Sequence, residues 1–519
     1  MSDDQTFADA IEGYCGSLSY QPGQPVSLHI STTAARFSVT VQRWGADRQT
    51  VWSAVDQPGQ HHLPPADADA QGCRWPETLT IPTTTDWESG FYLVTLEASE
   101  GPEDDRGGRV NHAGFVLRAG DRRNRAVLVL ATNTWNAYNT WGGRSLYTGG
   151  HQVSFARPFA RGMLHRPTTE RDDRKARPVY TGETPDIDGV TFQQYRTDHN
   201  YPSAIGSTGW FTHERRFVEW AEALGYRFDY LISSDLDTDP HSLDGYDVVI
   251  GVGHDEYWSA DQRQRLDEFG ASGGDVVSLS GNTMFWQVRL TDTAPGLAMI
   301  CHKYRAHLDD PVMGSSDEST MTGMWADPVV GQPEWSLLGA GSAYGLYARF
   351  GAATPRGVGG FVIYRSDHWM LDGTNLGYGD VLGRDDGIVG YETVGCPIQL
   401  NDIGLPEAAP RPDLPAESTI VAFTPTSNLR VGQYPKSIAA LSDQGDAEFI
   451  AERVFGGIND ENLARAMHGN AVMMTSRPWG ASGGTMTVCG STDWVFGLSD
   501  PQVAQVTANI LNHSLTGER

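Results

Sequence analysis

The chain of 519 residues has few cysteines, few basic residues and no long apolar run, and each shortage excludes a class of protein. Its five cysteines are scattered without a CxxC pair, so neither a zinc ribbon nor a disulfide framework is expected. Lys and Arg total 38 against 65 Asp and Glu, without a basic stripe, so we expect no nucleic-acid partner. No stretch of about 18 apolar residues occurs, and no apolar run follows the acidic amino-terminal residues. We therefore expect a soluble cytoplasmic protein without a membrane segment.

Hydrophobic residues make up 39% of the chain, which indicates a folded protein, and two regions differ in their strand patterns. In residues 1–119, Val26, Leu28 and Ile30 alternate with polar neighbours, and further short strands follow between turn-rich segments. Short alternating strands at this spacing predict an immunoglobulin-like β-sandwich as the first domain.

The region 120–519 has another pattern. Continuous apolar runs, such as those at 126–131 and 247–253, are typical of strands in a sheet that is covered on both faces. Between such runs, Trp220 and Leu224 belong to a set of apolar residues at helical spacing that ends at a glycine. We therefore predict an α/β domain with a mostly parallel sheet and helices on both faces, similar to amidotransferases.

The most informative segment is the turn between the apolar run at 247–253 and a helix that Ser259 would cap. This turn carries His254 and Glu256 at the carboxyl end of a strand, where open α/β sheets bind ligands. Side chains two residues apart on an extended turn point the same way, which favours a shared site. The alternative is a helix-capping turn with a satisfied surface histidine. A class I amidotransferase would have a nucleophilic cysteine on this turn, and its absence excludes a glutaminase.

A polar and aromatic segment with Tyr138 and Tyr147 follows the first strand of the α/β region. If the strands are parallel, this segment lies at the same sheet edge as His254 and Glu256. Phenolate and carboxylate oxygens suit trivalent iron better than zinc, which prefers cysteine and histidine. The alternative is that both tyrosines only pack, with their hydroxyls bonded to loop backbone. Competitors for the second tyrosine position are Tyr180, Tyr195 and Tyr201.

Three further residues follow predicted strands or turns. Asn282 comes directly after a strand and would reach the same edge, although a turn asparagine is the alternative. Glu392 follows a later strand and is a candidate site acid. Lys303 would supply a cation to an oxyanion, with a solvated surface lysine as the alternative. The two G-x-S-x-G sequences, at 270–274 and 480–484, precede strands and are predicted turns rather than nucleophile elbows.

Taken together, these segments resemble the large, catalytic subunit of the N,N-dimethylformamidase family over residues 126 to about 513. The matching segments keep their order along the chain: Thr134-Trp135-Asn136-Ala137-Tyr138-Asn139, Gly143-Arg144-Ser145-Leu146-Tyr147, Ser154-Phe155-Ala156-Arg157-Pro158, the helix from Trp220 to Gly225, Gly253-His254-Asp255-Glu256-Tyr257, Ser280-Gly281-Asn282, Gly390-Tyr391-Glu392 and Ser491-Thr492-Asp493-Trp494.

The resemblance implies a mononuclear iron, Fe(III), and a set of residues around it. The implied iron ligands are Tyr138, Tyr147 and Glu256, and the implied catalytic residues are His254, Asn282, Glu392 and Lys303. Iron would polarise an amide carbonyl and lower the pKa of a bound water, while His254 or Glu392 moves protons to the leaving amine. Which of these two residues is the base stays open.

We therefore expect an iron-dependent hydrolase of the carbon–nitrogen bond in a small or N-substituted amide. One alternative is a tyrosinate–iron enzyme with oxidative or ring-modifying chemistry, since a fold does not define a reaction. Another is a non-catalytic module that binds carbohydrate or protein. The expected partner is a small-molecule amide; a homo-oligomer is compatible with the sequence, and the need for a small partner subunit stays open.

Overall fold

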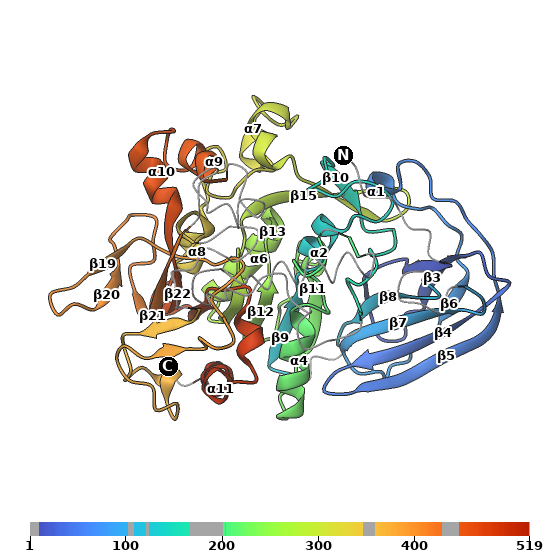
Figure 1. Ribbon diagram of the computed structural model, residues 1–519, viewed down its shortest axis with the longest axis horizontal. Helices are drawn as coiled ribbons and strands as arrows, with labels where there is room; N and C mark the ends of the chain where they lie inside the picture. Colours follow the sequence, from blue (N-terminus) through green and yellow to red (C-terminus); the bar gives the residue numbers. More distant parts are fainter. Residues whose placement is uncertain are drawn as a thin grey trace, which may run out of the picture. The chain divides into compact units, whose positions relative to one another are not determined.

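The structure is a computed structural model (Figure 1). It describes the residues in seven ranges of the chain. These ranges are 10–101, 108–120, 124–166, 201–202, 204–345, 359–427 and 446–517. The chain divides into two compact units. Unit 1 comprises Met1–Asp173, Gln193–Ser242 and Val288–Cys301, and unit 2 comprises Arg174–Phe192, Leu243–Gln287 and His302–Arg519. The domain boundary expected at residue 119 stays a prediction.

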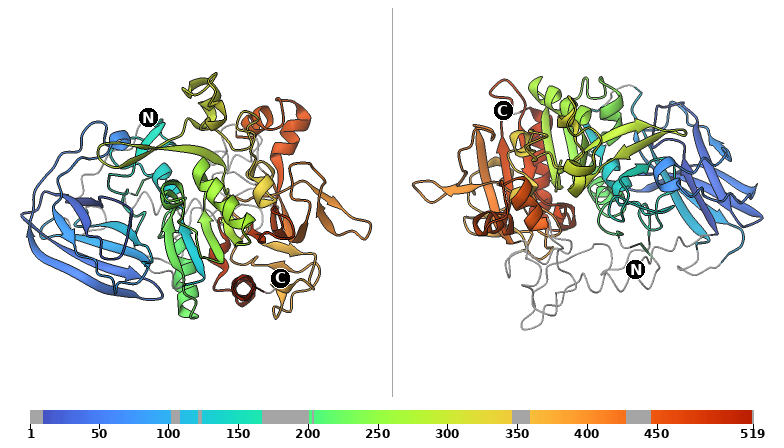
Figure 2. Two further views of the ribbon diagram at one scale, coloured as in Figure 1. Left: turned by 180° about the vertical axis from the view of Figure 1, so that it is seen from behind. Right: turned by 90° about the horizontal axis from the view of Figure 1, so that it is seen from above.

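The amino-terminal part of unit 1 consists of two β-sheets around one core. One sheet has the order β1 (Ile11–Cys15), β3 (Val26–Thr32), β6 (Leu79–Ile81), and the other the order β2 (Ser19–Tyr20), β8 (Val110–Leu117), β7 (Gly90–Ala98), β4 (Arg36–Trp44), β5 (Arg48–Pro58). Only β2 and β8 pair in parallel among these described strands. The blue strands of the second sheet lie side by side in every view (Figure 1, Figure 2). The alternating residues Val26, Leu28 and Ile30 are buried in the shared core, as their pattern predicts.

The rest of unit 1 is built around a parallel pair of strands, β9 (Ala126–Leu130) and β11 (Asp229–Ile232). Helix α4 (Glu214–Ala223) buries Phe217 and Ala221, but of the other two residues of the predicted apolar face Trp220 is half-buried and Leu224 is 61% exposed. Gly225 follows the helix with φ of 92°. Glycine suits this position because other residues rarely adopt positive φ. The remaining elements are α1 (Ala68–Gln71), α2 (Thr132–Tyr138), α4 (Glu214–Ala223), α5 (Ser233–Thr238), and an antiparallel set of β10 (Gln152–Ser154), β16 (Leu297–Ile300) and β15 (Trp286–Asp292).

Unit 2 is built around a mixed sheet. Its strand order is β12 (Val248–His254), β14 (Asp275–Gly281), β23 (Met486–Cys489), β22 (His468–Ser476), β21 (Ser418–Ser427), β17 (Phe361–Ile363), β18 (Val381–Leu382). The other elements are β13 (Tyr257–Ser259), α6 (Ala260–Ala271), η1 (Lys303–Arg305), α7 (Ala306–Asp309), η2 (Glu318–Thr320), α8 (Trp335–Leu338), η3 (Ser342–Tyr344), η4 (Trp369–Leu371), β19 (Ile398–Leu400), β20 (Pro406–Ala408), α9 (Asp446–Arg453), α10 (Asp460–Met467), η6 (Trp494–Gly497) and α11 (Pro501–Thr516). Among the helices described, none is both long and apolar enough to cross a membrane.

The prediction of a mostly parallel sheet with helices on both faces, similar to amidotransferases, is wrong. Among the described strands of unit 2, parallel pairing joins only β12, β14 and β23, and the pairs beyond them are antiparallel. An apolar run such as 472–474 reports burial on both faces and leaves the strand direction undefined. Direction follows the connection: the short link 477–485 between β22 and β23 has no crossover helix, so these strands run antiparallel.

Candidate functional site

The carboxyl ends of β12 and β14 place two of the predicted polar residues side by side in unit 2. The strands pair in parallel with His254 opposite Gly281, so His254 and Asn282 leave neighbouring strand ends. Asn282 has φ of 50°, which turns the chain sharply out of the strand. Ser259 caps α6 as predicted, since its side chain accepts a hydrogen bond from the Gln262 backbone N–H. The local strand–turn–helix unit thus exists although the sheet as a whole is mixed.

Close backbone packing at Gly281 holds Glu392 against this strand end. A Cβ atom at Gly281 would lie 2.3 Å from the Glu392 backbone oxygen and 2.4 Å from the Thr492 backbone nitrogen. These distances are below van der Waals contact, so only glycine fits at this position. The Thr492 backbone N–H donates to the same Glu392 oxygen at 3.0 Å. The predicted segments around residues 281, 392 and 492 therefore converge through their backbones.

Three buried side chains form the candidate site, which we call the His–Glu–Glu trio: His254, Glu256 and Glu392. His254 Nε2 lies 2.6 Å from Glu392 Oε2 and 3.3 Å from Glu256 Oε2. Asn282 Nδ2 donates to Glu392 Oε2 at 3.0 Å and lies 3.4 Å from His254 Nε2. One ligand atom from each member of the trio lies within 4.8 Å of the others, so the trio can hold a metal ion. The ring of Tyr391 is perpendicular to the His254 ring, with 5.6 Å between centroids.

The electrostatics of the trio favour a charged imidazole. Burial by itself would lower the pKa of His254, but the nearby carboxylates of Glu392 and Glu256 raise it to about 10. The neighbouring Asp255 is also buried, and burial raises the pKa of its carboxyl to about 7. Two carboxylates thus share one imidazole, and this arrangement attracts a cation.

Trp286 is a site residue that the sequence did not reveal. Its indole Nε1 donates to Glu256 Oε1 at 2.7 Å, and its backbone N–H donates to the Glu256 carbonyl at 3.0 Å. In the sequence Trp286 looks like any core tryptophan, and it is indeed only 1% exposed. Trp286 meets Glu256 because the chain folds back after the turn at 282–285. The spacing of apolar residues in the sequence does not indicate such a turn.

Lys303 lies among aromatic rings. It is 5% exposed, so the alternative of a solvated surface lysine is wrong. Its Nζ lies 5.2 Å from the ring centroid of Trp286 and 5.7 Å from that of Tyr257. These distances are within the range of cation–π contacts. Lys303 therefore contacts a residue that holds Glu256.

Tyr138 and Tyr147 come together within unit 1. Their ring centroids are 4.2 Å apart with 34° between the ring planes, and Tyr138 is buried whereas Tyr147 is half-buried. The Leu146 backbone N–H donates to the Ala137 carbonyl at 3.1 Å, which ties the two segments together. The two tyrosines belong to unit 1, and the His–Glu–Glu trio belongs to unit 2. Each distance given above joins atoms within one unit.

Of the competing tyrosines, Tyr180 and Tyr195 lie outside the described residues. Tyr201 is buried, and its ring centroid lies 5.6 Å from the guanidinium carbon of Arg161. It packs within unit 1, and its place as a competing tyrosine ligand stays a prediction.

A buried arginine organises the loop that carries the two tyrosines. The Arg157 guanidinium donates to the backbone oxygens of Trp141 at 2.5 Å, Ser154 at 2.9 Å and Asn139 at 3.1 Å. Burial lowers the pKa of Arg157 to about 10, so it still carries its charge at neutral pH. These charge-assisted bonds hold several loop carbonyls around one side chain. The segments 132–142 and 152–158 are thereby fixed to each other.

Comparison with known protein families gives a match over most of the chain. The model of a family described as N,N-dimethylformamidase beta subunit-like, C-terminal, matches residues 38–508. That range includes the His–Glu–Glu trio and both tyrosines. No curated protein matches the chain.

Proposed function

The chain belongs to the N,N-dimethylformamidase beta subunit-like family, and from this premise we propose that it hydrolyses the carbon–nitrogen bond of a small or N-substituted amide. The family itself indicates amide hydrolysis. The structural observation that supports the proposal is the buried His–Glu–Glu trio at the end of β12, with Asn282 bonded to one of its carboxylates. Buried groups of this kind concentrate at functional sites.

The donor atoms fit a hard metal ion. We propose Tyr138, Tyr147 and Glu256 as the ligands of a ferric iron, because phenolate and carboxylate oxygens suit this ion. The trio is a second donor set that shares Glu256 with the first. When bound, the iron would act as a Lewis acid on the amide carbonyl and lower the pKa of a water molecule.

The remaining residues are placed to handle protons. His254 Nε2 and Glu392 Oε2, 2.6 Å apart, can hold a proton between them and release it to the nitrogen of the leaving amine. Asn282 donates to the same Glu392 oxygen and so fixes the orientation of that carboxylate. The burial of all three side chains keeps bulk water away from this proton. The products are a carboxylic acid and an amine, formed with one water molecule.

The visible spectrum and iron content of the purified protein test this proposal, with Tyr138→Phe and Tyr147→Phe as variants and Tyr201→Phe as a matched control. We expect a phenolate-to-iron band that weakens or shifts in both variants and is unchanged in Tyr201→Phe; a band lost in Tyr201→Phe and kept in Tyr147→Phe would identify Tyr201 as the second tyrosine ligand. Tyr92→Phe, which changes a buried core tyrosine of unit 1, is the further control that should leave the band unchanged. Amides should release amine without oxygen uptake. A colourless, metal-free protein would contradict the proposal, and oxygen uptake would point to oxidative chemistry. Iron without a phenolate band, lost on His254→Ala, would identify the trio as the ligand set.

The family description names a beta subunit, so we also propose that the chain works in an assembly of several chains. The native mass of the purified protein distinguishes a homo-oligomer from a chain that needs a second, smaller subunit. A cytoplasmic location also stays a proposal, and fractionation of cells tests it.

A further inference from the structure

We propose that Trp286 is a positioning residue for Glu256: it holds Oε1 of the carboxylate and leaves Oε2 as the single ligand atom that Glu256 presents to a metal ion. The inference rests on the proposed function, because it specifies how one proposed ligand is oriented. It goes beyond that function by assigning different roles to the two oxygens of Glu256.

Trp286 contacts Glu256 twice. The indole Nε1 donates to Oε1 at 2.7 Å, and the backbone N–H donates to the Glu256 carbonyl oxygen at 3.0 Å. The indole N–H is a donor only, so this bond has a fixed direction, and its acceptor carboxylate makes it charge-assisted. The other oxygen, Oε2, faces His254 Nε2 at 3.3 Å. The two oxygens of Glu256 thus have different partners.

The Trp286 ring is itself held in place. It is 1% exposed, and it packs edge-to-face against Phe285 and Tyr304 with centroid distances of 4.7 and 5.2 Å. The backbone of Trp286 also forms an antiparallel bridge with Met324. A ring fixed on several sides does not swing away from Glu256. The carboxylate is therefore oriented when the protein folds, before any metal ion binds.

Lys303 reinforces this arrangement. Its Nζ lies 5.2 Å from the Trp286 ring centroid and 5.7 Å from that of Tyr257, the residue that follows Glu256. A cation over the face of an indole draws electron density from the ring, which makes its N–H a stronger donor. Lys303 thus acts on Glu256 through Trp286.

This geometry limits how Glu256 can bind a metal ion. Because the Trp286 N–H engages one lone pair of Oε1, Glu256 would hold a metal ion through Oε2 in preference to both oxygens. Outer partners of this kind typically change metal affinity by about 10- to 100-fold when removed.

Resistance to a chelator tests the inference in the purified, iron-loaded protein. Trp286→Phe keeps an aromatic ring and removes the N–H donor. The matched control is Trp335→Phe, because buried Trp335 also donates its indole N–H to a carboxylate, Asp413 Oδ2 at 2.8 Å, that is not a member of the trio. We expect the chelator concentration that removes half of the iron to fall by about 10- to 100-fold in Trp286→Phe and to stay at the wild-type value in Trp335→Phe.

Lys303→Met is the second variant, useful if Trp286→Phe folds poorly. It should lower chelator resistance by a smaller factor, about 2- to 10-fold, because it only weakens the donor. Wild-type resistance in both Trp286→Phe and Lys303→Met would overturn the inference, as would an equal loss in Trp286→Phe and Trp335→Phe. Failure of the proposed function has another signature: the wild-type protein holds iron with the expected Trp286 effect but releases no amine from amides.

Discussion

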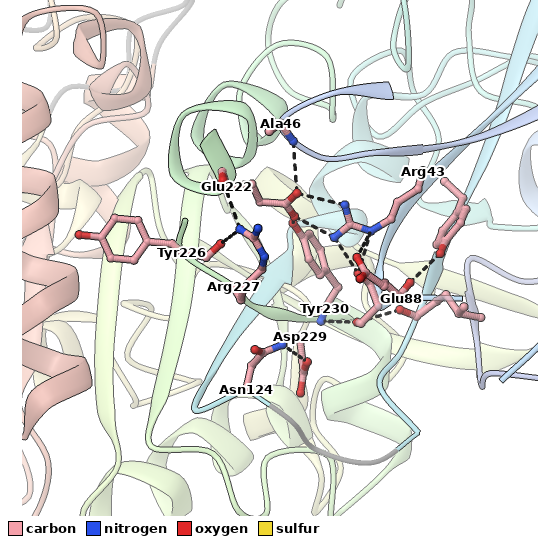
Figure 3. Close-up of polar contacts among 12 residues, drawn as sticks. Arg43, Ala46, Glu88, Asn124, Glu222, Tyr226, Arg227, Asp229 and Tyr230 are labelled. Atoms are coloured by element: carbon pink, nitrogen blue, oxygen red, sulfur yellow. Dashed lines mark hydrogen bonds and ion pairs between the residues drawn. The ribbon is translucent and has the colours of Figure 1, made fainter. Parts of the chain in front are cut away.

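Each unit of the protein contains a buried carboxylate cluster, and the two clusters differ in their charge balance. In unit 1, Glu222 faces one guanidinium (Figure 3): its Oε1 accepts from Arg43 Nη2 and the Tyr230 hydroxyl, both at 2.9 Å, and its Oε2 accepts from Arg43 Nη1 at 3.0 Å and Ala46 N–H at 3.2 Å. In unit 2, Glu256 and Glu392 both approach His254. In the first cluster one buried carboxylate, Glu222, pairs with one guanidinium, which the exposed Glu88 also approaches at 3.7 Å; in the second cluster two buried carboxylates share one imidazole.

The clusters also differ in their place along a strand. The Glu222 cluster lies at the amino end of β11, beside a polar cavity of about 730 Å³ whose lining includes Arg43, Glu88 and Asp229 (Figure 3). The His–Glu–Glu trio lies at the carboxyl end of β12. Although burial raises the pKa of Glu222, the charge and hydrogen bonds of Arg43, together with the hydrogen bonds from Tyr230 and the Ala46 backbone, lower it more, and the net shift is downward. The comparison teaches that a matched pair stabilises the fold, whereas an excess of buried anions prepares a cation site.

The largest expected effect comes from breaking the matched pair. Glu222→Gln leaves the buried Arg43 guanidinium with only the exposed Glu88 carboxylate, 3.7 Å away, as its counter-charge, and we expect the free energy of unfolding to fall by about 3 kcal/mol, the lower end of the range for a broken buried pair. Denaturant unfolding at neutral pH measures this change. The iron content per folded chain should stay at the wild-type value.

The double variant Arg43→Met, Glu222→Gln serves as the control, because removing both charges should restore part of the lost stability. If Glu222→Gln is as stable as the wild type, the cluster has no structural role and the comparison fails.

Glu256→Gln tests the His–Glu–Glu trio, and it should change iron binding and activity rather than stability. We expect loss of iron and a fall in amide hydrolysis of about 10²- to 10³-fold, the scale of losing one electrostatic group in a catalytic site. With iron removed from both proteins, the free energy of unfolding of the variant should be no lower than that of the wild type, because the variant removes one of two neighbouring carboxylates. Iron content and amine release are measured on the protein as purified, and denaturant unfolding on the iron-free protein. Destabilisation equal to that of Glu222→Gln would show that the trio is structural.

Parts of this comparison were predictable from the sequence. The apolar run before His254 and the Ser259 cap define a strand–turn–helix unit, and local patterns of this kind depend on few distant contacts. Asn282 and Glu392 were predicted at the same edge, and both contact His254. The sheet as a whole was not predictable in this way, because apolar runs report burial and not strand direction.

The contacts that orient these residues were also beyond the sequence. Trp286 donates to Glu256 across 30 residues, and Arg43 meets Glu222 across 179. Such pairs depend on tertiary packing. Nothing in the sequence distinguishes a tryptophan or arginine that forms one from other residues of the same type. The alternative of a solvated surface lysine at position 303 was wrong for the same reason: the rings of Trp286 and Tyr257 lie close to its ammonium group.

The smallest expected effect is an opposite pH dependence of stability in the two units. In unit 1, burial and the neighbouring His165 lower the pKa of His112 to about 3, so stability is lost as pH falls below the unfolded value of about 6.5. In unit 2, burial raises the pKa of Glu334 to about 7, so stability is lost as pH rises from about 4.5. Each group contributes at most about 1.4 kcal/mol per pH unit in its window. Urea unfolding should therefore show a smaller loss of stability as pH falls from about 6.5 in His112→Gln, and a smaller loss of stability as pH rises from about 4.5 to 7 in Glu334→Gln. Identical profiles in both variants would refute the contrast.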